Sequence, residues 1–409
     1  MHRTSGRLRL PLLVVAAVAV AEAAVLLLRP RDGLIRPQPV SARSYFSAAE
    51  IDRARDFRRP QLALYGVTVA IEAGVLVLLI RRPPRWLPRR FIIAGAVVSL
   101  VVGVAPLPVQ AVMRQRAIDV GLVTQSWGDW AGDVAKSSAI GAVLAGLGAG
   151  LAGLLVRRFG RWWWAPGSVV VVAAGAAFLY AGPVVLDPVF NRFTPLPQGT
   201  TRTEVLALAR QAGVKVGQVY EVDASRRTTG ANAYVTGLGS TKRVVLYDNL
   251  LKDFTPAETK LVVAHELGHV HYRDVPHGLL YVLLVAPLGL LAVSRLTDTW
   301  AGGDRRRWVP ALTLAIGVVS FPVTVVSNQL SRRIEARADA FALKLTHETA
   351  PFIGFQKRIA VRNIADPDPP TWITDLLATH PTAVQRIGIA KAYEELTPPI
   401  APRRTPAGS

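Results

Sequence analysis

Residues 253–274 read DFTPAETKLVVAHELGHVHYRD, and this stretch predicts a capped helix. Thr255 suits the N-cap position, and Pro256 suits the first helical position. Glu258 stands three residues after Thr255, which completes a capping box of the T-x-x-E kind. The helix should therefore begin at Pro256 and run to about residue 273, through the most polar cluster of the stretch.

That cluster, H-E-x-x-H, predicts a metal site. His265 and His269 lie about one helical turn apart, so both ring nitrogens can reach a single zinc ion at about 2.0–2.1 Å. Glu266 follows His265 directly, where a general base for an attacking water is needed. Five letters alone arise by chance, and the capped helix supplies the structural context that the pattern requires.

A third ligand for a catalytic zinc is expected in SNQLSRRIEARADA, residues 327–340. On a helix, one stripe of this stretch carries Asn328, Ser331, Arg332, Glu335 and Asp339. Glu335 is the candidate ligand, and the alternative is a solvated charged face on which Glu335 pairs with Arg332. Two apolar runs separate His269 from Glu335, and two membrane crossings return a chain to its starting side, so the ligands can meet.

Composition points to a membrane protein rather than a nucleic-acid-binding one. The chain has 409 residues, 51% of them hydrophobic, and a formal net charge of +20. Residues 1–186 hold 22 Lys and Arg against 9 Asp and Glu, mostly as arginine clusters between apolar runs. This is the pattern of membrane flanks, so no nucleic-acid partner is expected. Cysteine is absent, which excludes disulfides and thiolate metal ligands.

Seven apolar runs are long enough to cross a bilayer core of ~30 Å as helices. They cover residues 10–28, 61–80, 91–112, 139–156, 168–186, 277–294 and 308–328. The first run is interpreted as a retained helix rather than a cleaved signal peptide. Glu22 and Glu72 fall inside the first two runs, so each should face the bundle interior or a wet cavity, as a satisfied interior carboxylate or as part of a proton relay.

The polar region 187–275 predicts a small helix-plus-strands unit. TRTEVLALARQAG, residues 201–213, has helical periodicity, and VYEVDAS, NAYVTGL and KRVVLYD alternate as strands. We therefore expect a mostly α fold: a polytopic membrane bundle of seven spans with a small α+β zinc metalloprotease domain. The predicted division is residues 1–186 as an N-terminal membrane domain with five spans, 187–396 as the metallopeptidase domain with spans six and seven, and 397–409 as a disordered tail.

Four segments together resemble the type I CAAX prenyl proteases, which are integral-membrane zinc metalloendopeptidases. The segments are NAYVTGLGSTKRVVLYDNLL, HELGH, SRRIEARAD and THPTAVQRI, in this order over roughly residues 190–395. The resemblance implies a domain of the gluzincin type and one zinc ion per chain, held by His265, His269 and Glu335, with Glu266 as the base. It further implies that Asp339 hydrogen-bonds a ligating histidine.

The same resemblance implies a substrate cleft. Asn232, Ala233 and Tyr234 would belong to an edge strand that holds a peptide or protein substrate as an added strand. His380 would stabilise the oxyanion with support from Arg386, although His380 could instead cap a helix. The Ala-, Arg- and Val-rich composition looks bacterial, so the prenylated substrate of the eukaryotic members is not carried over.

Other functions fit parts of the sequence. A stress-linked zinc protease that degrades misfolded membrane proteins has fewer spans before its motif. A membrane sensor with H-E-x-x-H needs a further ligand-binding domain, and a transporter or scaffold leaves the ligand set without a reason. The resemblance implies a bacterial inner-membrane protein with a cytoplasmic active site. In that orientation the short cytoplasmic loops hold 11 basic residues and the short outside segments hold 15, whereas an excess of basic residues is expected on the cytoplasmic side. The sequence specifies no oligomeric state.

Overall fold

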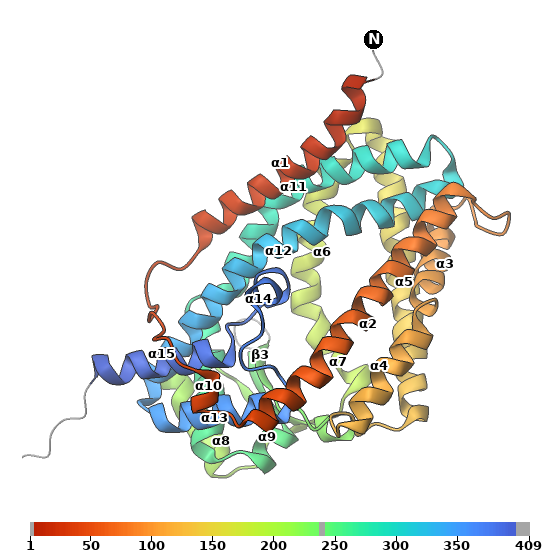
Figure 1. The fold of residues 1–409 in the computed structure, drawn as a ribbon. Helices are drawn as coiled ribbons and strands as arrows, with labels where there is room; N and C mark the ends of the chain where they lie inside the picture. Colours follow the sequence, from red (N-terminus) through yellow and green to blue (C-terminus); the bar gives the residue numbers. More distant parts are fainter. Residues whose placement is uncertain (1–3, 237–241, 398–409) are drawn as a thin grey trace, which may run out of the picture.

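The computed structural model describes residues 4–236 and 242–397 of the chain. Its long helices form a frame, and a smaller mixed α/β unit packs against one end of that frame (Figure 1). The predicted strand-connecting residues 237–241 lie outside the described residues, and so does the predicted disordered tail apart from Thr397.

The frame consists of long apolar helices, as predicted. Six helices of the described residues are long and apolar enough to cross a membrane, and a bent pair brings the number to seven if it counts as one span. The six are α1 (Thr4–Leu28), α2 (Ala48–Arg81), α5 (Trp127–Phe159, continued by the 3-10 turn η2, Gly160–Trp162), α6 (Trp164–Val185), α11 (Asp274–Ala301) and α12 (Arg305–Thr346). The chain is therefore a multi-pass membrane protein of mostly α fold.

The third predicted span, residues 91–112, is not one straight helix. It is divided into α3 (Phe91–Val104) and α4 (Leu107–Asp119), which meet at an angle of 46°. Pro106 and Pro108 stand at this break. Because proline lacks an N–H and its ring clashes with the preceding turn, two prolines one residue apart interrupt the helix that hydropathy alone would continue.

The mixed unit contains a four-stranded sheet of order β1-β2-β4-β3. Its strands are β1 (Phe193–Pro195), β2 (Gln218–Val222), β3 (Ala233–Thr236) and β4 (Arg243–Tyr247). β2 and β4 run parallel, and the two outer pairs are antiparallel, with Tyr234 opposite Val245. The three predicted strands are confirmed, and β1 was not predicted. Among the described residues, β3 pairs with a strand on one side only.

Helices cover the sheet and enclose the core. The helices that contribute to this core are α8 (Thr200–Gln211), α9 (Asp248–Asp253), α10 (Pro256–His271), α13 (Thr349–Arg362) and α15 (Ala383–Leu396). The other short helical elements are α7 (Asp187–Phe190), which contacts α6, and α14 (Thr371–Leu377), which contacts α12, with the 3-10 turns η1 (Ala42–Ser44) and η3 (Ala224–Arg226). The predicted capping box is confirmed, since Thr255 and Glu258 bond each other's backbone at the start of α10. Leu246, Leu267 and Leu343 are fully buried between sheet, α10 and α12.

Two connections hold the mixed unit to the frame. α12 is a single helix of 42 residues, so it continues past its apolar part into the mixed unit and lies along α10 (Figure 1). The linker 29–47 between α1 and α2 crosses α15, where the Gln38 backbone N–H donates to Gly388 O at 3.0 Å. A Cβ on Gly388 would lie 2.2 Å from Gln38 O, so only glycine permits this crossing.

Candidate metal centre

Helix α10 presents the two motif histidines toward one point. The Nε2 atoms of His265 and His269 lie 3.3 Å apart, and their rings are nearly perpendicular with centroids 4.9 Å apart. His265 is buried, and its neighbours along α10 pack into the core of the mixed unit. The helix is thus anchored on its apolar faces while one polar face carries both imidazoles.

Helix α12 brings a carboxylate to the same point. Glu335 Oε2 lies 3.1 Å from His265 Nε2, and Glu335 Oε1 lies 3.6 Å from His269 Nε2. Glu335 is buried. The carboxylate of Glu335 therefore lies next to both imidazoles, although it stands 66 positions after His269 in the sequence. This agrees with the expectation that two membrane crossings return the chain to the side on which it started. The predicted alternative, a pair between Glu335 and Arg332, is not formed in the described residues.

Each imidazole is oriented from behind by its own carboxylate. Asp339 Oδ1 accepts from His265 Nδ1 at 2.9 Å, and Asp274 Oδ2 accepts from His269 Nδ1 at 2.9 Å. A hydrogen bond from Nδ1 selects the tautomer whose Nε2 is free for a metal. Both Nε2 atoms accordingly face Glu335, and neither Nδ1 does.

Sequence reasoning missed Asp274 and the arginine behind it. Arg337 Nη2 donates to Asp274 Oδ1 at 2.5 Å, which holds the carboxylate while its other oxygen contacts His269. The preceding residue, Arg273, adopts a left-handed backbone with φ 57°, which ends α10 and starts α11 within a tight turn. That turn directs Asp274 back toward His269. The available signal was an acid five residues after the motif, at the start of a new apolar run.

Arg386 forms its ion pair with Asp339, behind the imidazole of His265. Its guanidinium donates to both oxygens of Asp339, at 2.8 Å to Oδ2 and in a closer contact to Oδ1. Asp339 is completely buried, so the arginine compensates a charge that has no access to water. The described residues contain no hydrogen bond between Arg386 and His380, but both line the cleft next to the cluster, so the predicted support of His380 and the predicted contact with substrate stay predictions.

His380 reaches the same cluster from the segment before α15. Its Nε2 lies 3.3 Å from Glu335 Oε2, and its Nδ1 lies 2.9 Å from the hydroxyl of Thr379. The alternative role as a helix cap is not what the structure has, because Thr382 caps α15. The ring remains largely accessible, with 58% of the side chain exposed. An exposed imidazole next to a buried ligand is suited to meet an incoming group.

A small cleft opens next to the cluster. It has a volume of about 90 Å³, and its polar lining comes from Asn232, His265, Glu266, Asp339, Gln356, His380 and Arg386. Asn232 immediately precedes the edge strand β3, and its backbone carbonyl accepts from Tyr247 N at 3.1 Å. Ala233 is buried, while the Tyr234 hydroxyl donates to Asp187 at 3.3 Å. Of the predicted substrate segment, Asn232 borders the cleft, whereas Ala233 and Tyr234 are not among the residues that line it.

Burial and charge shift the pKa values of the cleft residues. Burial raises the pKa of Glu266, which favours proton uptake by this carboxyl nearer to neutral pH. Although 58% of its side chain is exposed, the part of the ring that faces the cluster is removed from water, and this lowers the pKa of His380, so its imidazole is neutral at pH 7. Burial also opposes protonation of His265, but its hydrogen bonds to Asp339 and Glu335 prevail and raise the pKa to about 10.

The donor set matches a metal cation. Within the described residues, the ligand atoms of His265, Glu266 and His269 lie within 4.8 Å of one another, and the Glu335 oxygens lie between the two imidazoles. Two nitrogens and one carboxylate, each imidazole oriented from behind, form the kind of set that catalytic zinc sites use. When each Nδ1 donates to its own carboxylate, the neutral imidazoles present two Nε2 lone pairs that lie 3.3 Å apart, and a cation bound between them would satisfy both.

The remaining predicted polar groups lie elsewhere. His271 faces away from the cluster, as its position on the helix implies, and donates to Ala212 O at 3.0 Å. Glu22 accepts from Gln329 at 3.3 Å between α1 and α12. Glu72 lines an otherwise mostly apolar cavity of about 620 Å³ among α2, α3, α5, α6, α11 and α12. These contacts agree with interior-facing carboxylates.

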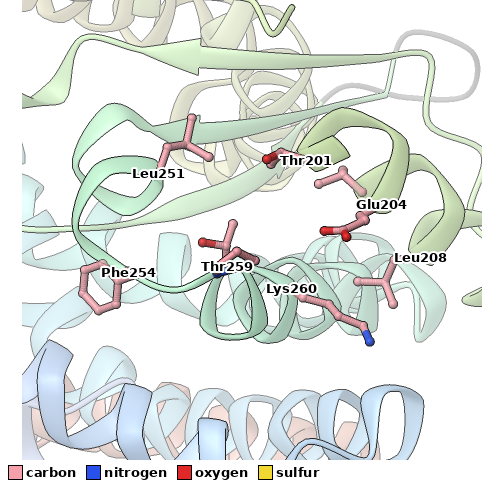
Figure 2. A pocket seen from close by; sticks show the side chains of 9 residues that line it. Thr201, Glu204, Leu208, Leu251, Phe254, Thr259 and Lys260 are labelled. Atoms are coloured by element: carbon pink, nitrogen blue, oxygen red, sulfur yellow. The ribbon is translucent and has the colours of Figure 1, made fainter. Parts of the chain in front are cut away.

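A second hollow of about 90 Å³ lies between α8 and the start of α10 (Figure 2). Figure 2 shows Glu204 and Lys260 reaching its rim from the two helices, with Leu208, Leu251 and Phe254 around it. No histidine lines it, and Lys260 forms an ion pair with Glu348 at 3.9 Å. Its lining holds one carboxylate, Glu204, and one ammonium, Lys260, but no set of metal ligands like that of the cluster formed by α10 and α12.

Comparison with known proteins identifies similar chains. The model of the family described as Peptidase family M48 matches residues 195–394. The chain is 30% identical over 308 residues to "Uncharacterized metalloprotease YhfN" of Bacillus subtilis, covering 73% of this chain and 72% of that protein. It is 29% identical over 270 residues to "Probable CAAX prenyl protease 1" of Schizosaccharomyces pombe, covering 62% of this chain and 56% of that protein.

The fold is similar to a solved one. The crystal structure of S. mikatae Ste24p superposes with a TM-score of 0.74 at 17% sequence identity, covering 94% of this chain and 99% of that one. At this identity the likeness concerns the fold alone. It extends over the helical frame as well as the mixed unit, because nearly the whole of both chains is covered.

Proposed function

This chain belongs to peptidase family M48 and is a membrane-embedded metalloprotease, and on that premise we propose that it is a zinc-dependent endopeptidase acting on extended segments of peptides or proteins. One observation carries the proposal: the Nε2 atoms of His265 and His269 and the carboxylate oxygens of Glu335 lie 3.1–3.6 Å apart. The histidines come from α10, which precedes the hairpin of α11 and α12, and the glutamate comes from α12. Two imidazoles and one carboxylate, with no thiolate in the chain, form a zinc site with an open position.

The residues divide the work of hydrolysis. A zinc ion bound by these three side chains would supply Lewis-acid chemistry, activating water and polarising the scissile carbonyl. Glu266 takes a proton from the attacking water, and it returns that proton to the amine as the C–N bond breaks. Its raised pKa suits a group that must both accept and release a proton. His380, neutral and exposed, donates from Nε2 to the carbonyl oxygen as negative charge develops.

The edge strand supplies substrate binding. β3 pairs with β4 on one side only, so a substrate in extended conformation can add to its free edge and pass Asn232 into the cleft. Asn232, Ala233 and Tyr234 are the proposed contacts. Relatives named CAAX prenyl protease 1 suggest C-terminal segments as one class of substrate. The cleft holds only a narrow chain, so folded domains should be poor substrates.

We further propose that the protein resides in a bacterial inner membrane with the metal centre toward the cytoplasm. The B. subtilis relative supports a bacterial origin. We also propose to divide the chain at residue 187, with the membrane domain before it and the metallopeptidase domain over 187–396. Reporter fusions after residue 85 and at the C-terminus test the orientation, and an outward C-terminus would refute the cytoplasmic placement.

Paired substitutions test the catalytic assignment. Glu266→Gln should keep one zinc per chain and lose hydrolysis of a flexible peptide, because the ligands remain while the proton acceptor is gone. Glu335→Ala should lose both zinc and hydrolysis. Glu395→Gln, an exposed acid on α15, is the control and should change neither. Metal analysis of purified protein alongside the cleavage assay measures both quantities, and full hydrolysis by Glu266→Gln would refute the role of Glu266.

A further inference from the structure

The segment between α13 and α15, residues 363–382, carries His380 into the cluster and contains the short helix α14. Figure 1 shows α14 lying against α12, inside the frame. α14 is poorly anchored by apolar packing. Among its seven residues only Thr374 is buried, whereas Trp372, Leu376 and Leu377 are 57%, 40% and 38% exposed. Something other than burial must therefore hold this helix in place.

Two polar side chains of α12 hold it. Arg332 Nη1 donates to the carbonyl oxygens of Thr374 at 2.9 Å and Ala378 at 2.8 Å. One turn earlier, Asn328 Nδ2 donates to Leu376 O at 3.0 Å. Thr374 O also accepts from the backbone N–H of Ala378, at 3.1 Å, whereas the carbonyls of Leu376 and of the C-cap residue Ala378 lie at the end of α14, where a partner must come from outside the helix or from the turn that follows it. A guanidinium is favourable there because the C-terminal end of a helix carries partial negative charge.

The same face of α12 presents the metal ligand. Asn328, Arg332 and Glu335 lie on one stripe of the helix, with Arg332 only about 4.5 Å and Asn328 about 10.5 Å from Glu335 along the axis. His380 follows Ala378 by two residues, and its Nε2 lies 3.3 Å from Glu335 Oε2. The carbonyl that Arg332 binds is therefore the last attachment of the chain before His380.

We propose that Arg332 is a positioning residue for the reaction: by binding the C-terminal carbonyls of α14, it holds His380 against the ligand cluster. The inference rests on the proposed function, because it assigns the residue that places the oxyanion donor. The polar partners of Arg332 are the carbonyls of Thr374 and Ala378 and the carboxylate of Asp375, and none of these belongs to the predicted substrate contacts. Its effect on hydrolysis should therefore pass through His380 alone.

Steady-state hydrolysis of a flexible peptide by the full-length zinc-loaded protein tests this. The variants are Arg332→Ala, Arg332→Lys and the control Arg333→Ala, whose side chain is exposed on the adjacent position of α12. Each is made in the native chain and in a His380→Ala background. Because a single well-placed donor to an oxyanion is worth about 10²–10³ in kcat, Arg332→Ala should lower kcat by about 10-fold or more with zinc content and KM little changed. Arg332→Lys, a point charge that reaches one carbonyl, should recover part of the loss.

The double variants decide the mechanism. In the His380→Ala background, Arg332→Ala should cost less than about 2-fold, because a residue that acts through His380 has no further effect once His380 is gone. Full additivity of the two losses, loss of zinc in Arg332→Ala, or activity equal to that of Arg333→Ala would each overturn the inference. A native protein that hydrolyses peptides equally well without zinc would instead refute the proposed function.

A spectroscopic readout makes the test independent of turnover. The chain has no cysteine, so Leu377→Cys introduces a single site for a nitroxide spin label on the exposed side of α14. Adding Arg332→Ala should make the label more mobile in electron paramagnetic resonance, whereas adding Arg333→Ala should not. An equally immobile label in both proteins would show that α14 does not depend on Arg332.

Discussion

His269 Nδ1 lies 2.9 Å from Asp274 Oδ2, so the acid that orients the second motif histidine comes from the residue that opens the next transmembrane helix. The first motif histidine is oriented by Asp339, at the same distance, from α12. The two imidazoles therefore take their orientation from the two arms of one helical hairpin. A movement of α11 relative to α12 would therefore change the orientation of the imidazoles of His265 and His269.

Removing either orienting acid should weaken zinc binding. Asp274→Asn and Asp339→Asn should each lower zinc affinity by about 10- to 100-fold, because the Nδ1 hydrogen bond loses its charged acceptor and the tautomer is less strongly selected. Competition with a chromophoric chelator measures the affinity. Asp368→Asn, an exposed acid before α14, is the control. Unchanged affinity in Asp274→Asn would show that His269 is oriented by other contacts.

Removing Arg386 should destabilise the fold. Asp339 is completely buried, and Arg386→Ala would leave its carboxylate without its cation, which costs about 3–5 kcal/mol in the free energy of unfolding. Lys391→Ala breaks an exposed ion pair with Glu394 on the same helix and should cost less than about 1 kcal/mol. Thermal unfolding in detergent compares the two. Equal midpoints would argue that the buried pair contributes little.

A methyl group on Gly388 should separate the linker from α15. The new Cβ would lie 2.2 Å from Gln38 O, so the backbone must move, and we expect a loss of about 1–3 kcal/mol in unfolding free energy. Gly354→Ala on α13 meets its nearest atom at 3.8 Å and should be neutral or stabilising by up to about 1 kcal/mol, since alanine favours helix. Unfolding midpoints of the pair test this, and equal destabilisation would contradict it.

Zinc binding should release a proton. The pKa of His265 is raised to about 10 in the metal-free protein, so below that pH its imidazole holds a proton that must leave before Nε2 can bind a metal. Apparent zinc affinity should then rise by about tenfold per pH unit between pH 6 and 8, because one pKa unit corresponds to 1.36 kcal/mol. Isothermal titration in buffers of different ionisation enthalpy counts the protons. Affinity independent of pH would contradict the protonated state.

Local patterns explain what could be predicted. The capping box of Thr255 and Glu258 and the i, i+4 spacing of His265 and His269 are properties of one helix, so they are visible in the sequence. The strands over β2, β3 and β4 alternate in polarity, and the apolar runs identify the spans. In the third span, hydropathy predicted one continuous helix, whereas Pro106 and Pro108 indicate the position of the bend.

The sequence by itself determined most of the elements and the motif helix, since these depend on local spacing, and it predicted the candidate ligands His265, His269 and Glu335. Only the tertiary structure decided that Asp274 orients His269, that Arg386 compensates Asp339 and that Arg332 binds α14. Each of these contacts joins residues from different elements or across a turn. A long polar side chain forms a hydrogen bond with the partner that tertiary packing places within about 3 Å of it. Which partner that is depends on the arrangement of the helices rather than on the local sequence.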